Sequence, residues 1–249
     1  MPNFKLVIEY DGTNYCGWQT QKNHKSKAIQ ETIEHILQQI LQEKIHLIVS
    51  GRTDAGVHAQ AQVANFQTNS KITLDKLQKG LNSLLPDDIK ITRVGHVASA
   101  FHSRFSARSK TYRYLILNRT YPSALLKNRV YFFPQHLDVR TMQQEARCLV
   151  GRHDFKAFSR TGSRVKDTVR TIKKITIKKT PRDPLIIIEI TANGFLYNMV
   201  RNIVGTLVEA GKGKLRRGEL RKILLSRDRK LAGSNAPSQG LYLLKVNYD

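Results

Sequence analysis

The feature that most constrains the fold is the order in which two kinds of hydrophobic periodicity occur along the chain. Alternation of apolar and polar residues is typical of a half-buried strand, whereas apolar residues spaced by three and four are typical of an amphipathic helix. The first part reads strand, helix, strand, strand, helix, strand, over Phe4–Tyr10, Ala28–Gln42, Ile45–Ser50, Gln60–Gln67, Thr73–Leu85 and Ile89–Val97. This β-α-β-β-α-β order is that of a ferredoxin-like domain, in which helices cover one face of an antiparallel sheet.

A similar order recurs in the second part of the chain, without a repeat of the sequence itself. Strands are expected at Thr111–Leu117, Val169–Lys178, Leu185–Thr191 and Leu241–Asn247, and helices at Asp138–Val150, Phe195–Ala210 and Gly218–Leu225. We therefore expect an α+β fold of two ferredoxin-like (RRM-like) domains, residues 1–105 and 106–249, that share an extended antiparallel sheet. Its uncovered face, with a cleft where the domains meet, is the expected binding surface.

The charge of the chain is strongly positive and unevenly distributed. The 42 Lys and Arg against 19 Asp and Glu give a net charge of +23. Residues 1–105 hold 12 cations and 9 anions, whereas residues 106–249 hold 30 and 10. Such a field attracts polyanions, so nucleic acid or an anionic membrane surface is the expected partner. The segment Thr171–Lys179 reads as a strand with one apolar and one basic face, which can lie against an RNA backbone or simply be solvated.

Several classes of protein are disfavoured. The apolar stretches are only a few residues long, so no transmembrane helix is expected, and the start lacks the core of a signal peptide. Cys16 and Cys148 lie far apart and give neither a disulfide framework nor zinc-ligand spacing, so we expect a cytoplasmic protein. No phosphate-binding loop, dinucleotide-binding glycine motif or zinc-deaminase motif occurs, and we expect no metal or organic cofactor. The pair Asp87-Asp88 follows a proline and reads as a turn.

One loop combines residue types that chemistry can use. Gly51-Arg52-Thr53-Asp54-Ala55-Gly56-Val57-His58-Ala59 links two expected strands, where a rigid scaffold can present side chains to a ligand. The spacing alone favours a turn in which Asp54 bonds backbone N–H groups ahead of Gly56, since turn aspartates far outnumber catalytic ones. His58 reads as a structural hydrogen-bonding residue rather than a base. The residues alone leave both interpretations of Asp54 open.

The same loop closely resembles the signature of the tRNA pseudouridine synthase A family. The resemblance continues in the family's order over essentially the whole chain, in the segments Phe101–Ala107, Lys110–Tyr114, Asp154–Phe158, Phe195–Gly205 and Ala236–Leu243. It implies the pseudouridine synthase fold and an isomerase that converts uridine to pseudouridine in tRNA. It further implies a target in the anticodon stem-loop, at tRNA positions 38 to 40, no cofactor, and a homodimer.

The resemblance also implies that Asp54 is the catalytic residue. Uracil is detached from C1′ of the ribose, turned, and rejoined through its C5 atom. A carboxylate can attack C1′ or C6 as a nucleophile, or remove the C2′ proton and give a glycal. Each route needs Asp54 ionised, which a neighbouring cation would favour. The sequence does not choose among the routes.

Arg201 is a candidate for that cation. In its expected helix it lies beside a broad apolar stripe, so we expect it to be half buried and to need a charge partner. The resemblance implies that this partner is Asp54. The alternative is an arginine whose head reaches a surface phosphate.

Three further residues complete the expected site. The resemblance places Tyr112 in the uridine pocket, where its ring can stack on the base or its hydroxyl can act on it, although a strand tyrosine is otherwise a packing residue. Arg52, two residues before Asp54, can fill the space left when the uridine flips out, or contact a phosphate. Leu241 lines the uracil pocket by the same resemblance, although a leucine at a strand start is more often core.

The main competing interpretation is a non-catalytic RNA-binding protein built from two RRM-like units. The stretch Gln60–Phe66 has one aromatic residue and lacks the basic-glycine-aromatic opening of the RRM stacking motif, which disfavours it. A methyltransferase would need a glycine-rich nucleotide loop that is absent.

Overall fold

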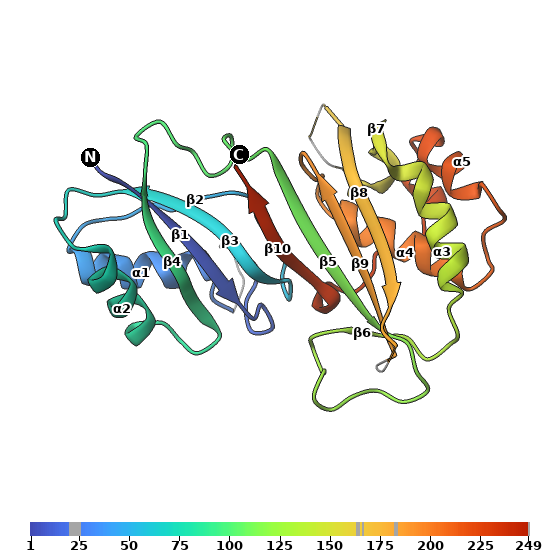
Figure 1. The fold of residues 1–249 in the computed structure, drawn as a ribbon, viewed down its shortest axis with the longest axis horizontal. Helices are drawn as coiled ribbons and strands as arrows, with labels where there is room; N and C mark the ends of the chain where they lie inside the picture. Colours follow the sequence, from blue (N-terminus) through green and yellow to red (C-terminus); the bar gives the residue numbers. More distant parts are fainter. Residues whose placement is uncertain (20–25, 163–164, 166, 182–183, 249) are drawn as a thin grey trace. The chain divides into compact units, whose positions relative to one another are not determined.

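The computed structural model describes residues 1–19, 26–162, 165, 167–181 and 184–248 (Figure 1). The fold is α+β, as predicted. The chain forms two compact units, residues 1–108 with 242–249, and residues 109–241. None of the helices in the described ranges is long and apolar enough to cross a membrane.

The first unit has the predicted order of elements. Its members are β1 (Asn3–Tyr10), α1 (Ile29–Leu41), β2 (Ile48–Val49), β3 (His58–Gln67), α2 (Leu74–Leu84) and β4 (Ile89–Val97). Strand β1 is antiparallel to both β3 and β4. Two strands share the other edge of β3: β2 pairs antiparallel at Ala64 and Asn65, and β10 (Leu241–Asn247) pairs parallel at His58 and Ala59.

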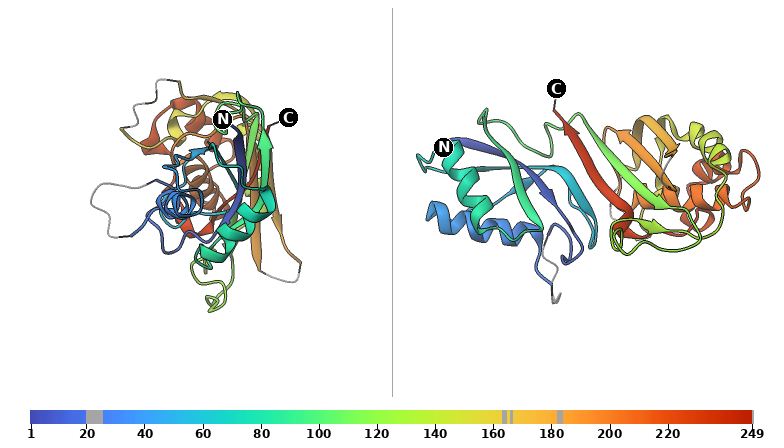
Figure 2. Two further views of the ribbon diagram at one scale, coloured as in Figure 1. Left: turned by 90° about the vertical axis from the view of Figure 1, so that its left-hand side faces the viewer. Right: turned by 60° about the horizontal axis from the view of Figure 1, so that its bottom comes forward.

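The core of the first unit lies between its sheet and its helices. Figure 2 shows α1 and α2 on one side of the strands. Thr73 is the N-cap that precedes α2, and its side chain accepts a hydrogen bond from Lys76 N. The residues of β1 alternate as expected, and the helices turn their apolar faces to the same core, which includes Phe4, Leu6, Ile8, Ile29, Ile33, Leu37, Leu77 and Leu81.

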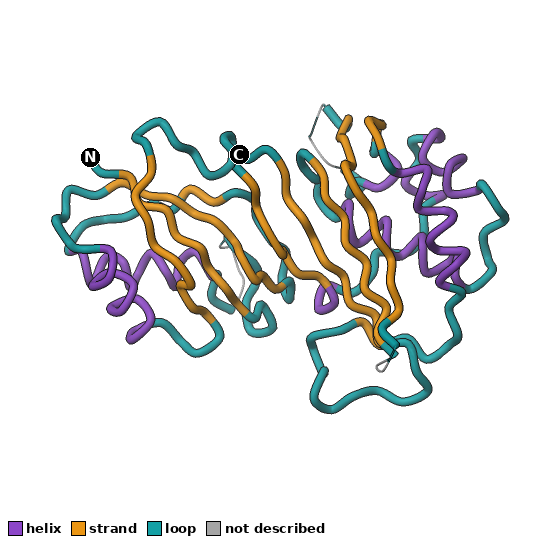
Figure 3. The backbone as a smooth tube through the Cα atoms, in the orientation of Figure 1, coloured by secondary structure: helices purple, strands orange, loops and turns teal. Residues whose placement is uncertain are grey.

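The second unit is built on strands β5, β9, β8 and β7, in that order across the sheet, with β6 beside β5. Figure 3 shows its helices grouped together. The bounds are β5 (Ser109–Leu117), β6 (Tyr131–Phe132), α3 (Val139–Ala146), β7 (Gly151–Asp154), β8 (Val169–Lys179), β9 (Leu185–Ala192), α4 (Met199–Gly211) and α5 (Glu219–Ser226). Short 3₁₀ turns are η1 (Arg147–Leu149), η2 (Lys156–Phe158), η3 (Arg229–Leu231) and η4 (Ser238–Gly240).

Strand β8 has the apolar face expected from its sequence, with Lys174 and Lys178 on the other face, but Lys179 pairs with the buried Ile186 and so lies on the apolar side. A bulge between Ile172 and Lys174 absorbs one extra residue, so Ile172 and Ile175 fall opposite Ala192 and Ile190, which are both buried. Its lysines Lys173, Lys174, Lys178 and Lys179 are exposed. The helix expected from Phe195 begins only at Met199, because Asn198 has the left-handed conformation with φ 64°.

The division of the chain differs from the predicted boundary at residue 105. The first unit extends to Arg108, and the last strand belongs to it from Tyr242 onward. Hydrogen bonds explain this: Arg108 N donates to Asn247 O at 2.9 Å, and the Tyr248 hydroxyl donates to Ser103 O at 2.9 Å. The alternating pattern of Leu241–Asn247 predicted a strand, but such a pattern does not specify the partner.

Candidate active site

The segment Ser50–Val57, here called the aspartate loop, leads from β2 to β3 and is fixed to the first unit at its start. Ser50 N donates to Val63 O at 2.8 Å, and the Ser50 hydroxyl donates to Gln62 Oε1 at 2.7 Å. The Gln62 amide in turn donates to Gly51 O at 2.8 Å. Gln62 is fully buried, so its side chain acts as an internal clamp on the loop.

A second buried contact holds the middle of the aspartate loop. Thr53 is buried, and its hydroxyl shares a hydrogen bond of 2.8 Å with the Tyr10 hydroxyl at the end of β1. Burial raises the pKa of Tyr10 to about 12, so this phenol stays protonated at neutral pH. The loop is therefore joined to the core by its Thr53 side chain.

The turn after β1 supports the other side of the aspartate loop. Gly17 forms an isolated antiparallel bridge with Asp54, and Trp18 N donates to Thr53 O at 3.0 Å. Gly17 has φ +109°, and a Cβ atom there would lie 2.6 Å from Thr53 O. Only glycine allows so close an approach in that conformation.

This support places the side chains of the loop on alternating sides. Arg52 is exposed, Thr53 is buried, and Asp54 is half buried, as expected for an extended segment. The following turn is closed by Val57 N, which donates to the main-chain oxygen of Asp54 at 3.2 Å. That bond does not use the Asp54 carboxylate. Arg52 makes no hydrogen bond or ion pair with any other described residue.

His58 has the structural role expected from the sequence. It is 2% exposed, its Nδ1 accepts a hydrogen bond from Gly12 N at 3.1 Å, and the same atom lies 3.1 Å from Asp11 Oδ1. Its ring stacks on Tyr242 of β10 at 4.7 Å between centroids. His58 thus joins the end of the aspartate loop to β10 and to the turn after β1.

The other expected site residues, Tyr112, Arg201 and Leu241, belong to the second unit. Tyr112 on β5 is 8% exposed, and its ring meets the edge of Phe195 at 5.0 Å in the segment that precedes α4. It shares a sheet face with Tyr114, which is fully buried. Tyr112 therefore points to the helix-covered face of this sheet, not to the uncovered face that we expected to form the binding surface.

Arg201 in the first turn of α4 is half buried, as predicted. Its Nε donates to Ala236 O at 2.7 Å, and Ala236 N donates back to Arg201 O at 3.2 Å. A further guanidinium nitrogen lies 3.4 Å from Asn198 Oδ1. The segment before β10 therefore fixes where this guanidinium lies.

Tyr114 links the expected site residues of the second unit. Its hydroxyl donates to Pro237 O at 2.6 Å, next to the residue that holds Arg201. Burial raises the pKa of Tyr114 strongly, while the charge of Arg201 opposes the rise. A Cβ atom on Gly240 would lie 2.7 Å from the Tyr114 ring, and Leu241, which follows, is buried. The strand bearing Tyr112, the helix bearing Arg201 and the segment ending in Leu241 thus pack together.

The sequence pointed to candidate site residues with reactive groups, but not to the residues that hydrogen-bond or pack against them. Tyr10, Gln62 and Tyr114 have no distinguishing spacing, because each lies in an ordinary strand pattern. Gly17 was the only one with a signal, as a glycine between Cys16 and Trp18 in a segment that is neither strand nor helix.

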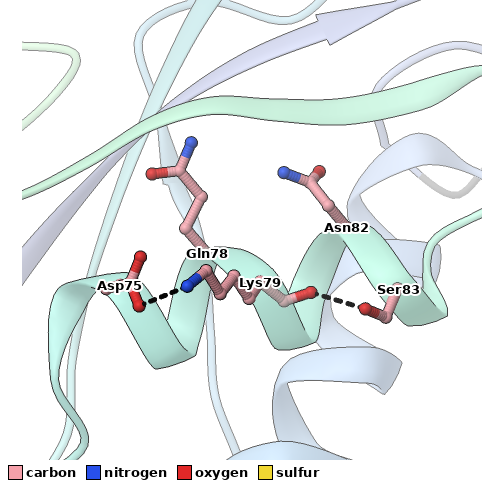
Figure 4. A pocket seen from close by; sticks show the side chains of 5 residues that line it. All are labelled: Asp75, Gln78, Lys79, Asn82 and Ser83. Carbon is pink, nitrogen blue, oxygen red and sulfur yellow. Dashed lines mark hydrogen bonds and ion pairs between the residues drawn. The ribbon is translucent and has the colours of Figure 1, made fainter.

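Within the described residues, no group of three or more His, Cys, Asp or Glu side chains is arranged to hold a metal ion. A surface pocket of about 490 Å³ lies along α2, lined by Asp75, Gln78, Lys79, Asn82 and Ser83 (Figure 4). In it Gln78 and Asn82 donate to Ile91 O on β4, so they join helix to sheet. The pocket contains none of the expected site residues.

The family of the chain follows from comparison with known proteins. The sequence profile described as tRNA pseudouridine synthase matches residues 6–106 and 146–249. The chain belongs to this family, an RNA-binding family of isomerases that act on tRNA.

Within the family, several similar curated relatives are named tRNA pseudouridine synthase A. The chain is 51% identical over 248 residues to tRNA pseudouridine synthase A of Acetivibrio thermocellus, and covers 100% of both chains. It is 48% identical over 248 residues, again with 100% of both chains covered, to proteins of that name from Thermoanaerobacter sp. and Ruminiclostridium cellulolyticum.

Solved structures also match this chain, among them two complexes. One is a Cbf5-Nop10-Gar1 complex, with a TM-score of 0.37 and 11% identity over 82% of this chain and 54% of that chain. The other is an H/ACA RNP bound to a substrate RNA containing 2′-deoxyuridine, with a TM-score of 0.35 and 10% identity over 83% of this chain and 53% of that chain.

Proposed function

We propose that this isomerase converts uridines in the anticodon stem-loop of tRNA, at positions 38 to 40, to pseudouridine, with Asp54 as its catalytic residue. The observation that carries the proposal is the aspartate loop. A half-buried carboxylate stands on a segment clamped by buried hydrogen bonds, with the exposed Arg52 on the same side. A reacting group must be held in this way, because small displacements reduce rates steeply.

The reaction needs one ionised carboxylate and no redox step. The bond from N1 of uracil to C1′ breaks, a bond from C5 to C1′ forms, C5 loses its proton, and N1 gains one. Asp54 assists by adding to C1′ or to C6, or by removing the C2′ proton. No external co-reactant enters the balance, which is why we propose catalysis without a cofactor.

The remaining site residues act on the substrate or on Asp54. We assign Arg201 as the cation that keeps Asp54 ionised, and Tyr112 and Leu241 to the pocket of the target uracil. Arg52 takes the space left by the flipped uridine. In this scheme the first unit supplies the carboxylate, and the more basic second unit completes the site and binds RNA.

We also propose that the protein is a homodimer and that it acts in the cytoplasm. Both statements follow from the family resemblance and from the tRNA substrate, and equilibrium sedimentation of the purified protein tests the first.

The decisive experiment measures release of the C5 hydrogen from tRNA labelled at that position of uridine. Wild type should release it, and Asp54→Ala should release none while binding tRNA with nearly unchanged affinity. Asp75→Ala, which removes an exposed carboxylate on α2, is the matched control and should behave as wild type. Appreciable turnover by Asp54→Ala would refute the catalytic role. Undiminished release from a tRNA whose stem-loop uridines are replaced by cytidine would refute the position.

A further inference from the structure

The segment 212–230, which includes α5, carries an unusual concentration of positive charge. It holds nine Lys and Arg against two Asp and Glu, so 19 residues supply +7 of the net +23. A local excess of this size attracts phosphates more strongly than the diffuse charge of the rest of the chain does.

Three of these cations form ion pairs with carboxylates of the second unit. Lys212 and Lys214 lie 3.0 and 3.5 Å from the Glu209 carboxylate, and Arg227 lies 3.0 Å from Asp154. These pairs neutralise part of the segment's charge.

Five other cations of the segment are exposed. Arg229 is not among them, because it is half buried and donates to Asn202 Oδ1 at 2.9 Å. Within the described residues, none of the five lies within 4.0 Å of a carboxylate. They define a basic surface made of Arg216, Arg217, Arg221, Lys222 and Lys230. Their charges are therefore available to an outside anion.

Buried contacts fix the backbone of α5, which carries part of the basic surface. The buried Glu145 carboxylate of α3 accepts hydrogen bonds from Gly218 N at 2.7 Å and from Leu220 N at 3.2 Å. It thus occupies the N-terminus of α5, and Leu220, Ile223 and Leu224 anchor the inner side of the helix. These contacts fix the backbone from which the cations of α5 project, so binding a ligand there does not have to order the helix itself.

The part of this surface on α5, which includes Arg221 and Lys222, lies away from Tyr112 of the expected uracil pocket within the second unit. Tyr112 is on β5, and α5 packs beside β7 and η2. Strands β9 and β8 lie between β5 and β7, so β5 and β7 are three strand spacings apart. At about 4.8 Å per spacing, that separation is roughly 14 Å before the depth of the helix layer is added. One phosphate group cannot contact both places.

We propose that the basic surface binds backbone phosphates of a part of tRNA outside the target stem-loop. The inference rests on the proposed function, which supplies the substrate and its target. Charge complementarity favours RNA over a second copy of this chain, because each copy carries +23. Such an anchor adds affinity for whole tRNA without acting on the reacting base, so it lowers KM and leaves kcat unchanged.

The test compares two triple variants on two substrates, whole tRNA and the isolated anticodon stem-loop. The first variant, Arg217→Gln with Arg221→Gln and Lys222→Gln, removes three charges from the basic surface. The control, Lys44→Gln with Lys71→Gln and Lys76→Gln, removes three exposed charges from the first unit. Circular dichroism and thermal unfolding check that both variants fold.

For whole tRNA, the surface variant should show KM raised about 10-fold or more, unchanged kcat, and a salt-dependence slope smaller by about 2 units. For the stem-loop, its KM should equal that of wild type, and the control variant should change neither value appreciably. The proposal is overturned if the surface variant binds whole tRNA as the control does, or if the stem-loop loses as much affinity as tRNA. Wild type that fails to release the C5 hydrogen from whole tRNA would instead contradict the proposed function.

Discussion

Replacing Gly17 by alanine should impair the chemistry proposed for Asp54 without removing any side chain of the proposed site. Gly17 bridges Asp54 and has φ +109°, where a side chain is strained. Its added Cβ would lie 2.6 Å from Thr53 O, and an ordinary carbon–oxygen contact needs about 3.3 Å. The aspartate loop must therefore move by roughly 0.7 Å, the difference between these two distances.

Two consequences follow in size. The backbone strain should lower the free energy of unfolding by about 1–3 kcal/mol. A displacement approaching 1 Å at a catalytic group can cost about 100-fold in rate, so kcat should fall about 10- to 100-fold. The KM for tRNA should change little, since no phosphate contact is altered.

The assay is steady-state release of the C5 hydrogen from labelled tRNA, with urea unfolding of the same preparations. Gly213→Ala is the matched control, because Gly213 also has a positive φ of +75° and no neighbour within 4 Å of its added Cβ. It should lose about 1–2 kcal/mol of stability and no activity. If Gly17→Ala keeps the wild-type kcat, or loses no more than Gly213→Ala, the close approach does not position Asp54 and the reasoning fails.

Three other perturbations test separate contacts. Burial raises the folded-state pKa of Tyr10 from 10.0 to about 12. The protonated phenol therefore contributes about 2–3 kcal/mol to the free energy of unfolding below pH 10, and this contribution is lost as the pH rises toward 12. Urea unfolding across that pH range should show a smaller loss of stability for Tyr10→Phe than for wild type. Glu145→Ala removes the acceptor for Gly218 N and Leu220 N, so it should lower the free energy of unfolding by about 1–3 kcal/mol. Its kcat on the isolated stem-loop should equal that of wild type. If the variant is as stable as wild type, these two hydrogen bonds do not contribute to stability. Arg201→Lys loses the bond from Nε to Ala236 O and should lower kcat at least about 10-fold, and an unchanged kcat would remove Arg201 from the site.

The sequence predicted most elements because their periodicity is local. The strands Ile89–Val97 and Leu241–Asn247 agree with the structure to the residue, and Thr73 and Asp138, the first residues of two expected helices, are the N-caps of α2 and α3. The strands Tyr131–Phe132 and Gly151–Asp154 were missed, since runs of two and four residues are too short to show a period. The start of helix α4 was predicted too early in the chain. Phe195 and Leu196 continue the apolar spacing of the helix, but the backbone leaves the helical conformation at Asn198.

What the sequence determined by itself is most of the elements and the basic charge, because each can be read from residues within a few positions; the candidate site residues came from the family resemblance. Only the tertiary structure decided that the last strand returns to pair with β3, and that Tyr112 faces the helices. Only it decided that Gly17, Tyr10 and Gln62 hold the aspartate loop. These contacts join residues that are far apart in the chain. They form because buried polar groups must find hydrogen-bond partners when the chain folds, and a local sequence pattern does not specify those partners.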